Sequence, residues 1–469
     1  MNALPRPRWA VLTAIGVFAA LELGFAIWAA LVAHGRFGPR IGYGPDSVLY
    51  LTAAHAPVWS RRFLAGPGAF GFPLLAKLCL RNVRAIVLVQ TFVSVGAWAF
   101  LASVASGIMR SNAARWVAFL GILGLGIAPG VLQWNAMITT ESVSISTLCI
   151  VIACGIRLVQ FGTWRDLVWF LAAMAAFAFT RDTNALVVGG IGVLALGFTL
   201  RSELRTRAAA IAFAGIVLVL GAMALSNAAQ PPRWYWPMAE TTAVRLLADP
   251  EATRYLVDHG FPWNPQMATL PQRYIYLYDP VRTGPSFAAF RSWVDRDGRR
   301  VYLRFLASHP GWALREPFNE RAALFALRDV EVYGHVYGNR PGGPFTAVGA
   351  VAAPRSAAVV QLWAVASAVA LVVLAVRQQV RRSLAAALGL IGALAVAGYY
   401  AAWYGDALEL NRHALSAAVQ LLIACWIVTA LVIDAIVRRA PVSEVRVPED
   451  ADLDDEEHQR APAGEPGDT

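Results

Sequence analysis

Four short polar clusters interrupt an otherwise very apolar chain, and their side chains are of the types that move protons and bind phosphate. The clusters are Asp46 in GPDSVLY, Glu141 in TTES, Arg181 and Asp182 in FTRDTN, and Asp406, Glu409, Arg412 and His413 in YGDALELNRH. Ionisable groups at membrane depth cost roughly 3 kcal/mol each on insertion scales, so such groups are usually functional. A carboxylate can deprotonate a hydroxyl group, and the planar fork of an arginine suits a phosphate.

Asp46 follows the first apolar run, in the segment GYGPDSVLYLTAAH. Asp46 and Ser47 can form the N-cap of a helix, which is a purely structural role. At the lip of a transmembrane bundle the same carboxylate would be partly desolvated and could act as a general base. The nearby His55, Arg61 and Arg62 either bind an anionic donor or belong to the membrane surface.

The second and third clusters allow similar alternatives. Glu141 either complements the dipole of a helix that the preceding threonines cap, or faces Asp46 and binds a metal or an acceptor hydroxyl. Arg181 and Asp182 stand between two apolar runs with almost no loop, so at least one of them points into the bundle or its mouth. They form either an internal ion pair or a site in which Arg181 binds a phosphate.

Spacing is most informative in the last cluster. Glu409 and His413 are four residues apart, and Asp406 and Glu409 are three apart. This spacing predicts that the three side chains share one face of a helix, with Arg412 on a neighbouring face. A carboxylate–imidazole pair beside an arginine fits a wall that binds phosphate, and the alternative is a solvated helix start.

The elements that position these clusters are predicted to be membrane helices. Of 469 residues, 57% are hydrophobic and only 15% are charged, and the mean hydropathy is +0.51. Runs of about twenty apolar residues suffice to cross a bilayer core of about 30 Å. The sequence therefore predicts an all-α polytopic membrane protein with about ten transmembrane helices, at 9–33, 85–108, 115–133, 142–160, 166–180, 184–200, 208–228, 356–376, 383–404 and 414–437.

The arginines that flank the apolar runs predict the orientation. Most of them fall in short loops on the same side as Arg6 and Arg8, which the positive-inside rule assigns to the cytoplasm. Both termini are then cytoplasmic, and the four clusters lie on the extracytoplasmic face. The loop 34–84 is basic yet placed outside; it either binds an anion or reflects a miscounted span. Lys77 is the single lysine among 40 basic residues, a skew that indicates a GC-rich bacterial genome and hence the bacterial cytoplasmic (inner) membrane.

Four parts follow from this pattern. They are an N-terminal transmembrane region with a catalytic-type first loop (1–228), an extracytoplasmic insert (229–353), the C-terminal transmembrane helices (354–438) and a disordered acidic cytoplasmic tail (439–469). The insert is predicted to be a small subdomain that lies on the membrane, with an amphipathic helix at 301–318. The four cysteines show no metal-binding spacing and are predicted to be buried core residues.

The order of these parts resembles the C-type glycosyltransferase superfamily, which uses polyprenyl-phosphate-linked sugars. The similarity lies in Asp46 of the first outer loop, in PGAFGFPLLAKL before the second span, in TES at the start of the fourth span and in the large late insert. The layout is similar to that of protein O-mannosyltransferases and the aminoarabinose transferases of lipid A. This resemblance implies that Asp46 is the general base or orients the acceptor. Those families commonly carry a second acid nearby, where this chain has Ser47 and Val48, which leaves a two-carboxylate metal site in doubt.

The residues and the resemblance together predict an inverting glycosyltransferase that moves a sugar from a polyprenyl-phosphate carrier to an extracytoplasmic glycan, lipid or protein. The predicted catalytic residues are Asp46 and Glu141, and the predicted substrate-binding residues are Arg61, Arg62, Arg181, Asp182, Glu409, Arg412 and His413. No metal site is predicted; a divalent metal is possible but unsupported, and the net charge of +10 does not indicate nucleic acid. The alternatives are a transporter or flippase, an O-antigen-type polymerase or ligase, and a non-enzymatic scaffold.

Overall fold

The computed structural model describes residues 8–31, 41–66, 68–199, 205–272, 275, 278–327, 331–332, 335–336, 343–405, 407 and 409–438. Four features of the sequence analysis lie wholly or partly outside the described residues. They are Arg6, the first part of the basic loop 34–84, Asp406 from the last polar cluster, and the acidic tail 439–469.

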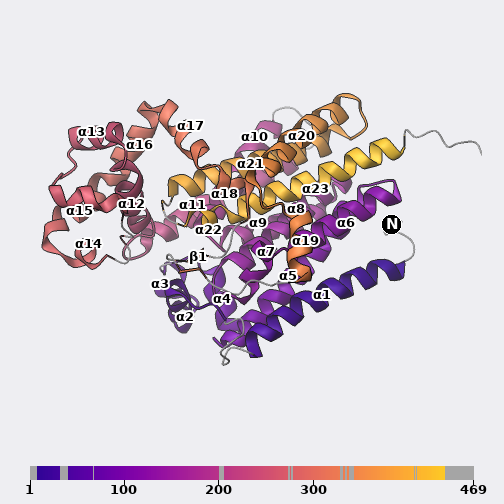
Figure 1. The fold of residues 1–469 in the computed structure, drawn as a ribbon, viewed down its shortest axis with the longest axis horizontal. Helices are drawn as coiled ribbons and strands as arrows, with labels where there is room; N and C mark the ends of the chain where they lie inside the picture. Colours follow the sequence, from indigo (N-terminus) through magenta and orange to yellow (C-terminus); the bar gives the residue numbers. More distant parts are fainter. Residues whose placement is uncertain are drawn as a thin grey trace, which may run out of the picture.

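Long apolar helices make up most of the described chain (Figure 1). Seven of them are long and apolar enough to cross a bilayer: α1 (Arg8–Leu31), α5 (Val83–Gly107), α8 (Glu141–Phe161), α11 (Arg205–Ala228), α20 (Ala357–Val376), α21 (Arg382–Gly405) and α23 (Leu415–Val437). The shorter helices α9 (Trp164–Ala178) and α10 (Asp182–Thr199) lie among them. The predicted all-α polytopic membrane protein is therefore confirmed, whereas the number of ten spans stays a prediction.

Many large apolar side chains on the outer surface of this bundle are exposed. Leu362 on α20 and Phe213 on α11 are each 71% exposed, and Val376 at the end of α20 is 75% exposed. A water-soluble protein rarely carries so much contiguous apolar surface, because that surface would drive association. These helix faces fit contact with lipid.

The predicted span 115–133 is not one straight helix. Its residues form α6 (Asn112–Gly126), then α7 (Pro129–Leu132) and the 3-10 turn η1 (Gln133–Ala136), with a bend of 50° between the two parts. Pro129 explains the break, because proline has no backbone N–H to donate and its ring disfavours helical geometry in the preceding residue. If these two parts are counted as one broken span, the described residues contain eight candidate spans.

Helices α8 and α23 are the most buried of the candidate spans and form the centre of the bundle. They touch within the first turn of each helix, where the hydroxyl groups of Ser144 and Ser416 lie 3.1 Å apart. Glu141 is the first residue of α8, and the four-residue helix α22 (Leu410–His413) directly precedes α23. The central pair of helices therefore brings the second and fourth polar clusters to one end of the bundle.

Three shorter helices lie between α1 and α5, on the same end of the bundle as the start of α8: α2 (Pro45–His55), α3 (Arg61–Leu64) and α4 (Gly71–Leu78). At the opposite end lie the start of α1 and the end of α23 (Figure 1). This arrangement agrees with the prediction that both termini share one side, and the identity of that side stays a prediction. All four cysteines are free and buried, as predicted.

The chain between α11 and α20 forms a helical lobe that projects from one end of the bundle (Figure 1). Its elements are α12 (Tyr235–Thr241), η2 (Thr242–Leu246), α13 (Pro250–Asp258), η3 (Pro265–Gln272), α14 (Asp279–Thr283), η5 (Pro285–Phe287), α15 (Ala288–Trp293), η6 (Val294–Gly298), α16 (Arg299–Ser308) and α17 (Pro310–Asn319). The short helix α18 (Ala322–Phe325) already packs against α20 and α23 of the bundle. A hairpin of β1 (Glu331–Val332) and β2 (His335–Val336) and then α19 (Pro344–Ala352) lead back to the bundle.

The lobe shares its hydrophobic core with the membrane helices. Trp312 of α17 lies edge-on against Trp403 of α21, with 5.7 Å between ring centroids, and the hydroxyl group of Tyr399 donates to the carbonyl oxygen of Pro317 at 2.6 Å. The predicted single amphipathic helix 301–318 is wrong. It is two helices, α16 and α17, because Pro310 cannot continue the hydrogen-bond ladder of α16.

Candidate functional site

One buried guanidinium group gathers three carboxylates from separate parts of the chain. Arg412 donates from Nε to Oε1 of Glu141 at 2.5 Å, from Nη1 to Oε2 of Glu409 at 2.8 Å and from Nη2 to Oδ2 of Asp46 at 2.6 Å. The side chains of Arg412 and Glu141 are 4% and 0% exposed, and that of Asp46 is 17% exposed. Each carboxylate binds a different nitrogen of the planar guanidinium group, whereas a lysine would have to reach all three from a single nitrogen.

The backbone of Glu409 shapes the last polar cluster. α21 ends at Gly405, and Glu409 adopts a left-handed conformation with φ of 54° immediately before α22. The prediction that Glu409 and His413 share one helix face is therefore wrong, because no helix runs through Glu409. The left-handed turn instead directs its carboxylate back to Arg412, three residues later.

Asp46 is held in place by its own loop rather than by capping. The N-cap of α2 is Gly44, and its backbone N–H donates to the hydroxyl oxygen of Ser47 at 3.0 Å. That hydroxyl group donates in turn to the carbonyl oxygen of Ile138 at 2.8 Å, and Gly42 pairs with Met137 in a parallel bridge. The N-cap role considered for Asp46 is wrong: it occupies the first turn of α2, and this loop is fastened to the segment that leads into Glu141.

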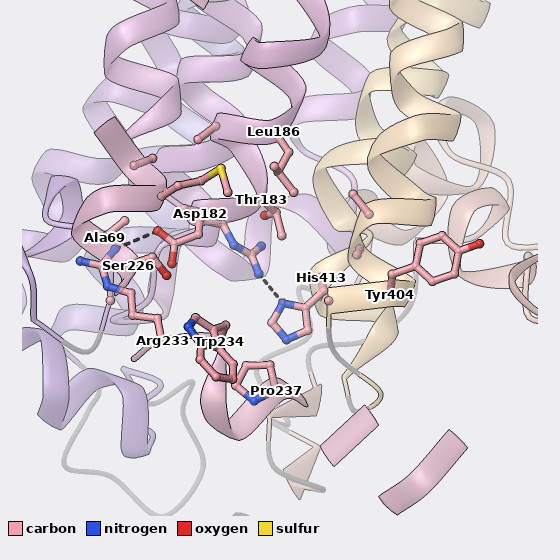
Figure 2. Close-up of a pocket in the computed structure, with 18 of the residues that line it drawn as sticks. Ala69, Asp182, Thr183, Leu186, Ser226, Arg233, Trp234, Pro237, Tyr404 and His413 are labelled. Carbon is pink, nitrogen blue, oxygen red and sulfur yellow. Dashed lines mark hydrogen bonds and ion pairs between the residues drawn. The ribbon is translucent and has the colours of Figure 1, made fainter. Parts of the chain in front are cut away.

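Arg181 lies beside Glu141 and reaches across to His413. Its Nη1 is 3.6 Å from Oε1 of Glu141, and its Nη2 is 2.6 Å from Nδ1 of His413, the contact drawn in Figure 2. A guanidinium group can only donate, so Nδ1 of His413 accepts this hydrogen bond and carries no proton. Arg181 therefore connects the cluster around Arg412 to the imidazole.

Asp182 does not pair with Arg181, which corrects one of the two interpretations of the third cluster. Its Oδ1 accepts from Nη1 of Arg233 at 2.8 Å (Figure 2). The same guanidinium group donates to the carbonyl oxygens of Gly66 at 2.8 Å and Leu64 at 3.1 Å. Arg233 thus ties the start of the lobe to α10 and to the segment after α3. Sequence reasoning missed Arg233, and its position in PPRWYWP, just after a span, was the available signal.

A cavity of about 610 Å³ opens beside these residues. Its polar part includes Asp46, Arg181, Asp182, Arg412 and His413, and Figure 2 shows several of these side chains around it. Its apolar part follows the membrane helices α10, α11 and α21: Leu186, Val219, Ala222, Met223, Ala401 and Ala402. The lobe closes another side. The cavity therefore suits a ligand with a polar head and an apolar chain.

Arg61 and Arg62 do not share this cavity. They line a second cavity of about 510 Å³, on the other side of α2. Asp46 and Tyr50 face the first cavity, whereas Leu49 and Ala53 face the second, as expected for positions on different faces of one helix. Arg61 also donates from Nη2 to the carbonyl oxygen of Ala228 at 2.7 Å. The structure thus separates these two arginines from the cluster with which the sequence analysis grouped them.

Counted over the described residues alone, the cluster around Arg412 holds more carboxylates than guanidinium groups. Among the described residues it holds three carboxylates (Asp46, Glu141 and Glu409) and two guanidinium groups (Arg181 and Arg412), so the balance is one negative charge when the imidazole is neutral. A positive charge that develops in the adjoining cavity would be stabilised by this excess.

Two groups that line the cavity and lie outside the spans illustrate how the site shifts pKa values. Burial alone would lower the pKa of Arg412, but the charges of Glu141, Asp46 and Glu409 outweigh this and raise it well above the ordinary value. Burial and, secondly, the negative charge of Asp46 raise the pKa of Tyr50. Arg412 is therefore a permanent cation, and the hydroxyl group of Tyr50 keeps its proton at the edge of the cavity.

Glu141 and Glu409 lie behind the cavity wall and contact Arg412. Within the described parts of the chain, no group of three or more histidine, cysteine or acidic side chains has the geometry of a metal site. The carboxylates that could contribute to one are directed to a guanidinium group instead.

Gly71, at the start of α4, positions the turn that carries Arg181. Its N–H donates to the carbonyl oxygen of Phe179 at 2.9 Å, and a Cβ at position 71 would lie 2.6 Å from that oxygen. We expect Gly71→Ala to lower the melting temperature in detergent, because backbone must move to relieve the clash. Gly96→Ala is the matched control, since a Cβ at Gly96 meets no atom within 4 Å. Equal melting temperatures for the two variants would contradict this close approach.

Comparisons with known proteins give a limited result. No protein-family model and no curated protein matches the chain. Among solved structures it is similar to the archaeal oligosaccharyltransferase AglB from Archaeoglobus fulgidus, in complex with an inhibitory peptide and a dolichol-phosphate, with 11% sequence identity and a TM-score of 0.46. The likeness covers 92% of this chain and 51% of that one, so the chain spans about half the length of AglB.

Proposed function

We propose that the chain is an inverting glycosyltransferase that moves a sugar from a polyprenyl-phosphate carrier to an acceptor outside the cytoplasm. The observation that carries the proposal is the two-part cavity. Acidic and cationic side chains from α2, α10 and α22 form one part, and the apolar faces of α10, α11 and α21 form the other. A lipid-linked sugar has this division, because its phosphate sits between a polar sugar and an apolar chain.

In this proposal Asp46 is the general base. Its carboxylate removes the proton from the acceptor hydroxyl as that oxygen attacks the anomeric carbon of the sugar. The bond between the anomeric carbon and the phosphate oxygen breaks, the bonding electrons leave with the polyprenyl phosphate, and the configuration at the anomeric carbon inverts. Arg412 fixes one carboxylate oxygen of Asp46, so that the base keeps one orientation through the reaction.

The charge balance of the site fits this reaction. Glycosyl transfer passes through a transition state with positive charge at the anomeric centre. Asp46 lines the cavity and Glu141 and Glu409 lie behind its wall, and their carboxylates would stabilise that charge. Arg181 and His413 line the same cavity, where their remaining N–H groups can donate hydrogen bonds to the polar head of the donor.

The orientation of the protein completes the proposal. The arginine-rich loops predict that the termini lie in the cytoplasm, and the site lies at the opposite end of the bundle from the start of α1 (Figure 1). The reaction would then take place on the outer face of a bacterial cytoplasmic membrane. The acceptor would be an envelope glycan, a lipid or a protein.

Binding of the carrier lipid tests the proposal. We expect a polyprenyl phosphate to raise the melting temperature of the purified protein in detergent, since a ligand at 100 times its Kd stabilises the folded state by about 2.7 kcal/mol. The matching polyprenol, which lacks the phosphate, should give a much smaller shift. Equal shifts with both lipids, or no shift with either, would contradict a lipid-phosphate site.

A further inference from the structure

The arginines that line the cavity differ in how many carboxylates or other hydrogen-bond acceptors already contact their guanidinium groups. These arginines are Arg181, Arg233, Arg299 and Arg412. Arg412 binds three carboxylates, Arg181 lies between Glu141 and His413, and Arg233 binds Asp182 and two carbonyl oxygens. An anionic ligand that bound one of these three guanidinium groups would compete with the carboxylates, the imidazole or the carbonyl oxygens that already contact it.

Arg299 is different. It is the first residue of α16, its side chain is exposed, and within the described residues no carboxylate oxygen lies within 4.0 Å of its guanidinium nitrogens. The nearby Arg296 and Arg300 both bind Asp297, away from the cavity. The guanidinium carbon of Arg299 lies 5.9 Å from the ring centroid of Trp234, a cation–π geometry that leaves its N–H groups available.

The position of Arg299 separates it from the acidic cluster. It belongs to the wall that the lobe contributes, with Trp234 of the α11–α12 junction and Tyr302, Leu303 and Leu306 of the same helix. The carboxylates belong to the wall that the membrane bundle contributes. A phosphate held on the lobe side would avoid the repulsion that it would meet beside Asp46, Glu141 and Glu409.

We infer that Arg299 binds the anionic group of the ligand in this cavity, and that this group is a phosphate ester carried by a lipid. This inference rests on the proposed function and adds to it that the lobe, rather than the bundle, supplies the uncompensated positive charge. It also gives the lobe a role in the reaction, because the cavity is incomplete without α16. Arg412 then serves to hold the carboxylates in position.

Binding of farnesyl phosphate, a short and soluble probe, to the purified full-length protein in detergent tests the inference. We expect Arg299→Ala to raise the Kd for farnesyl phosphate at least about tenfold, because the variant loses a hydrogen bond to a charged group. Arg299→Lys should retain part of the affinity, because it keeps the charge. Arg300→Ala is the matched control: it removes an adjacent exposed arginine that lies outside the cavity, and its Kd should equal that of the wild type.

Two further ligands distinguish the contribution of the phosphate to binding from that of the apolar chain. Farnesol should bind more weakly than farnesyl phosphate, and its Kd should be the same for the wild type and Arg299→Ala. Inorganic phosphate should compete with farnesyl phosphate in the wild type but not in Arg299→Ala. If the wild type and Arg299→Ala bind farnesyl phosphate equally, the role of Arg299 is wrong and the proposed function survives. If the wild type does not bind farnesyl phosphate, the proposed function is wrong and this inference falls with it.

Discussion

Arg412→Ala is expected to destabilise the protein more than any other single change at the site. The substitution removes the guanidinium group that Asp46, Glu141 and Glu409 share, and Glu141 is fully buried, with Arg181 as its other cationic neighbour among the described residues. Removing one partner from a buried ion pair typically costs about 3–5 kcal/mol, because the remaining charge is left without compensation. We expect a large fall in the melting temperature and in the yield of folded protein, together with loss of activity.

Two comparisons distinguish this effect from a general sensitivity to substitution. Arg315→Ala removes an exposed arginine that pairs with Glu316, and such surface pairs contribute only about 0–1 kcal/mol. Adding Glu409→Gln to Arg412→Ala removes one uncompensated carboxylate and should restore part of the melting temperature. If Arg412→Ala were as stable as Arg315→Ala, Arg412 would not be the centre of the cluster.

The second large effect is expected for Asp46→Asn. Asparagine has the shape of aspartate and can accept the hydrogen bond from Arg412, but it cannot take a proton from an acceptor hydroxyl. General-base catalysis contributes about 10²–10⁴ in rate, so kcat should fall by about this factor. Because asparagine keeps the shape of the side chain and the hydrogen bond from Arg412, the melting temperature and the affinity for a polyprenyl phosphate should stay near those of the wild type.

Glu409→Gln is the matched control for Asp46→Asn. It removes one negative charge from the same guanidinium group, but Glu409 is not part of the cavity wall. Its kcat should therefore fall much less than that of Asp46→Asn. Equal losses for the two variants would mean that the charge of the cluster matters and that Asp46 has no special role as a base.

The general position of the site could be predicted from the sequence, because the predicted spans place the polar clusters on the same side of the membrane. Asp46, Glu141 and Arg181 each interrupt the apolar pattern on the same predicted side of the membrane, and the structure brings them together. Which side chains touch was not predictable. The contact between Asp46 and Arg412 joins residues 366 positions apart, and the left-handed backbone of Glu409 has no signature in its spacing.

The lobe was the least predictable part. Arg233 and Arg299 stand in a segment without long apolar runs, so no periodicity relates them to the membrane helices that they face. Other errors were avoidable, since Pro129 and Pro310 stand inside segments that were predicted as continuous helices. Proline marks a probable end of a helix even where the apolar pattern continues.

The proposed function requires that the protein transfer a sugar from a polyprenyl-phosphate carrier bound in the two-part cavity. The most direct measurement is the release of polyprenyl phosphate from a panel of polyprenyl-phosphate sugars, by purified wild-type and Asp46→Asn protein supplied with an envelope extract as the source of acceptors. We expect release from at least one donor by the wild type, and little or none by Asp46→Asn. Binding of the carrier without release from any donor in the panel, or equal release by the two proteins, would contradict it.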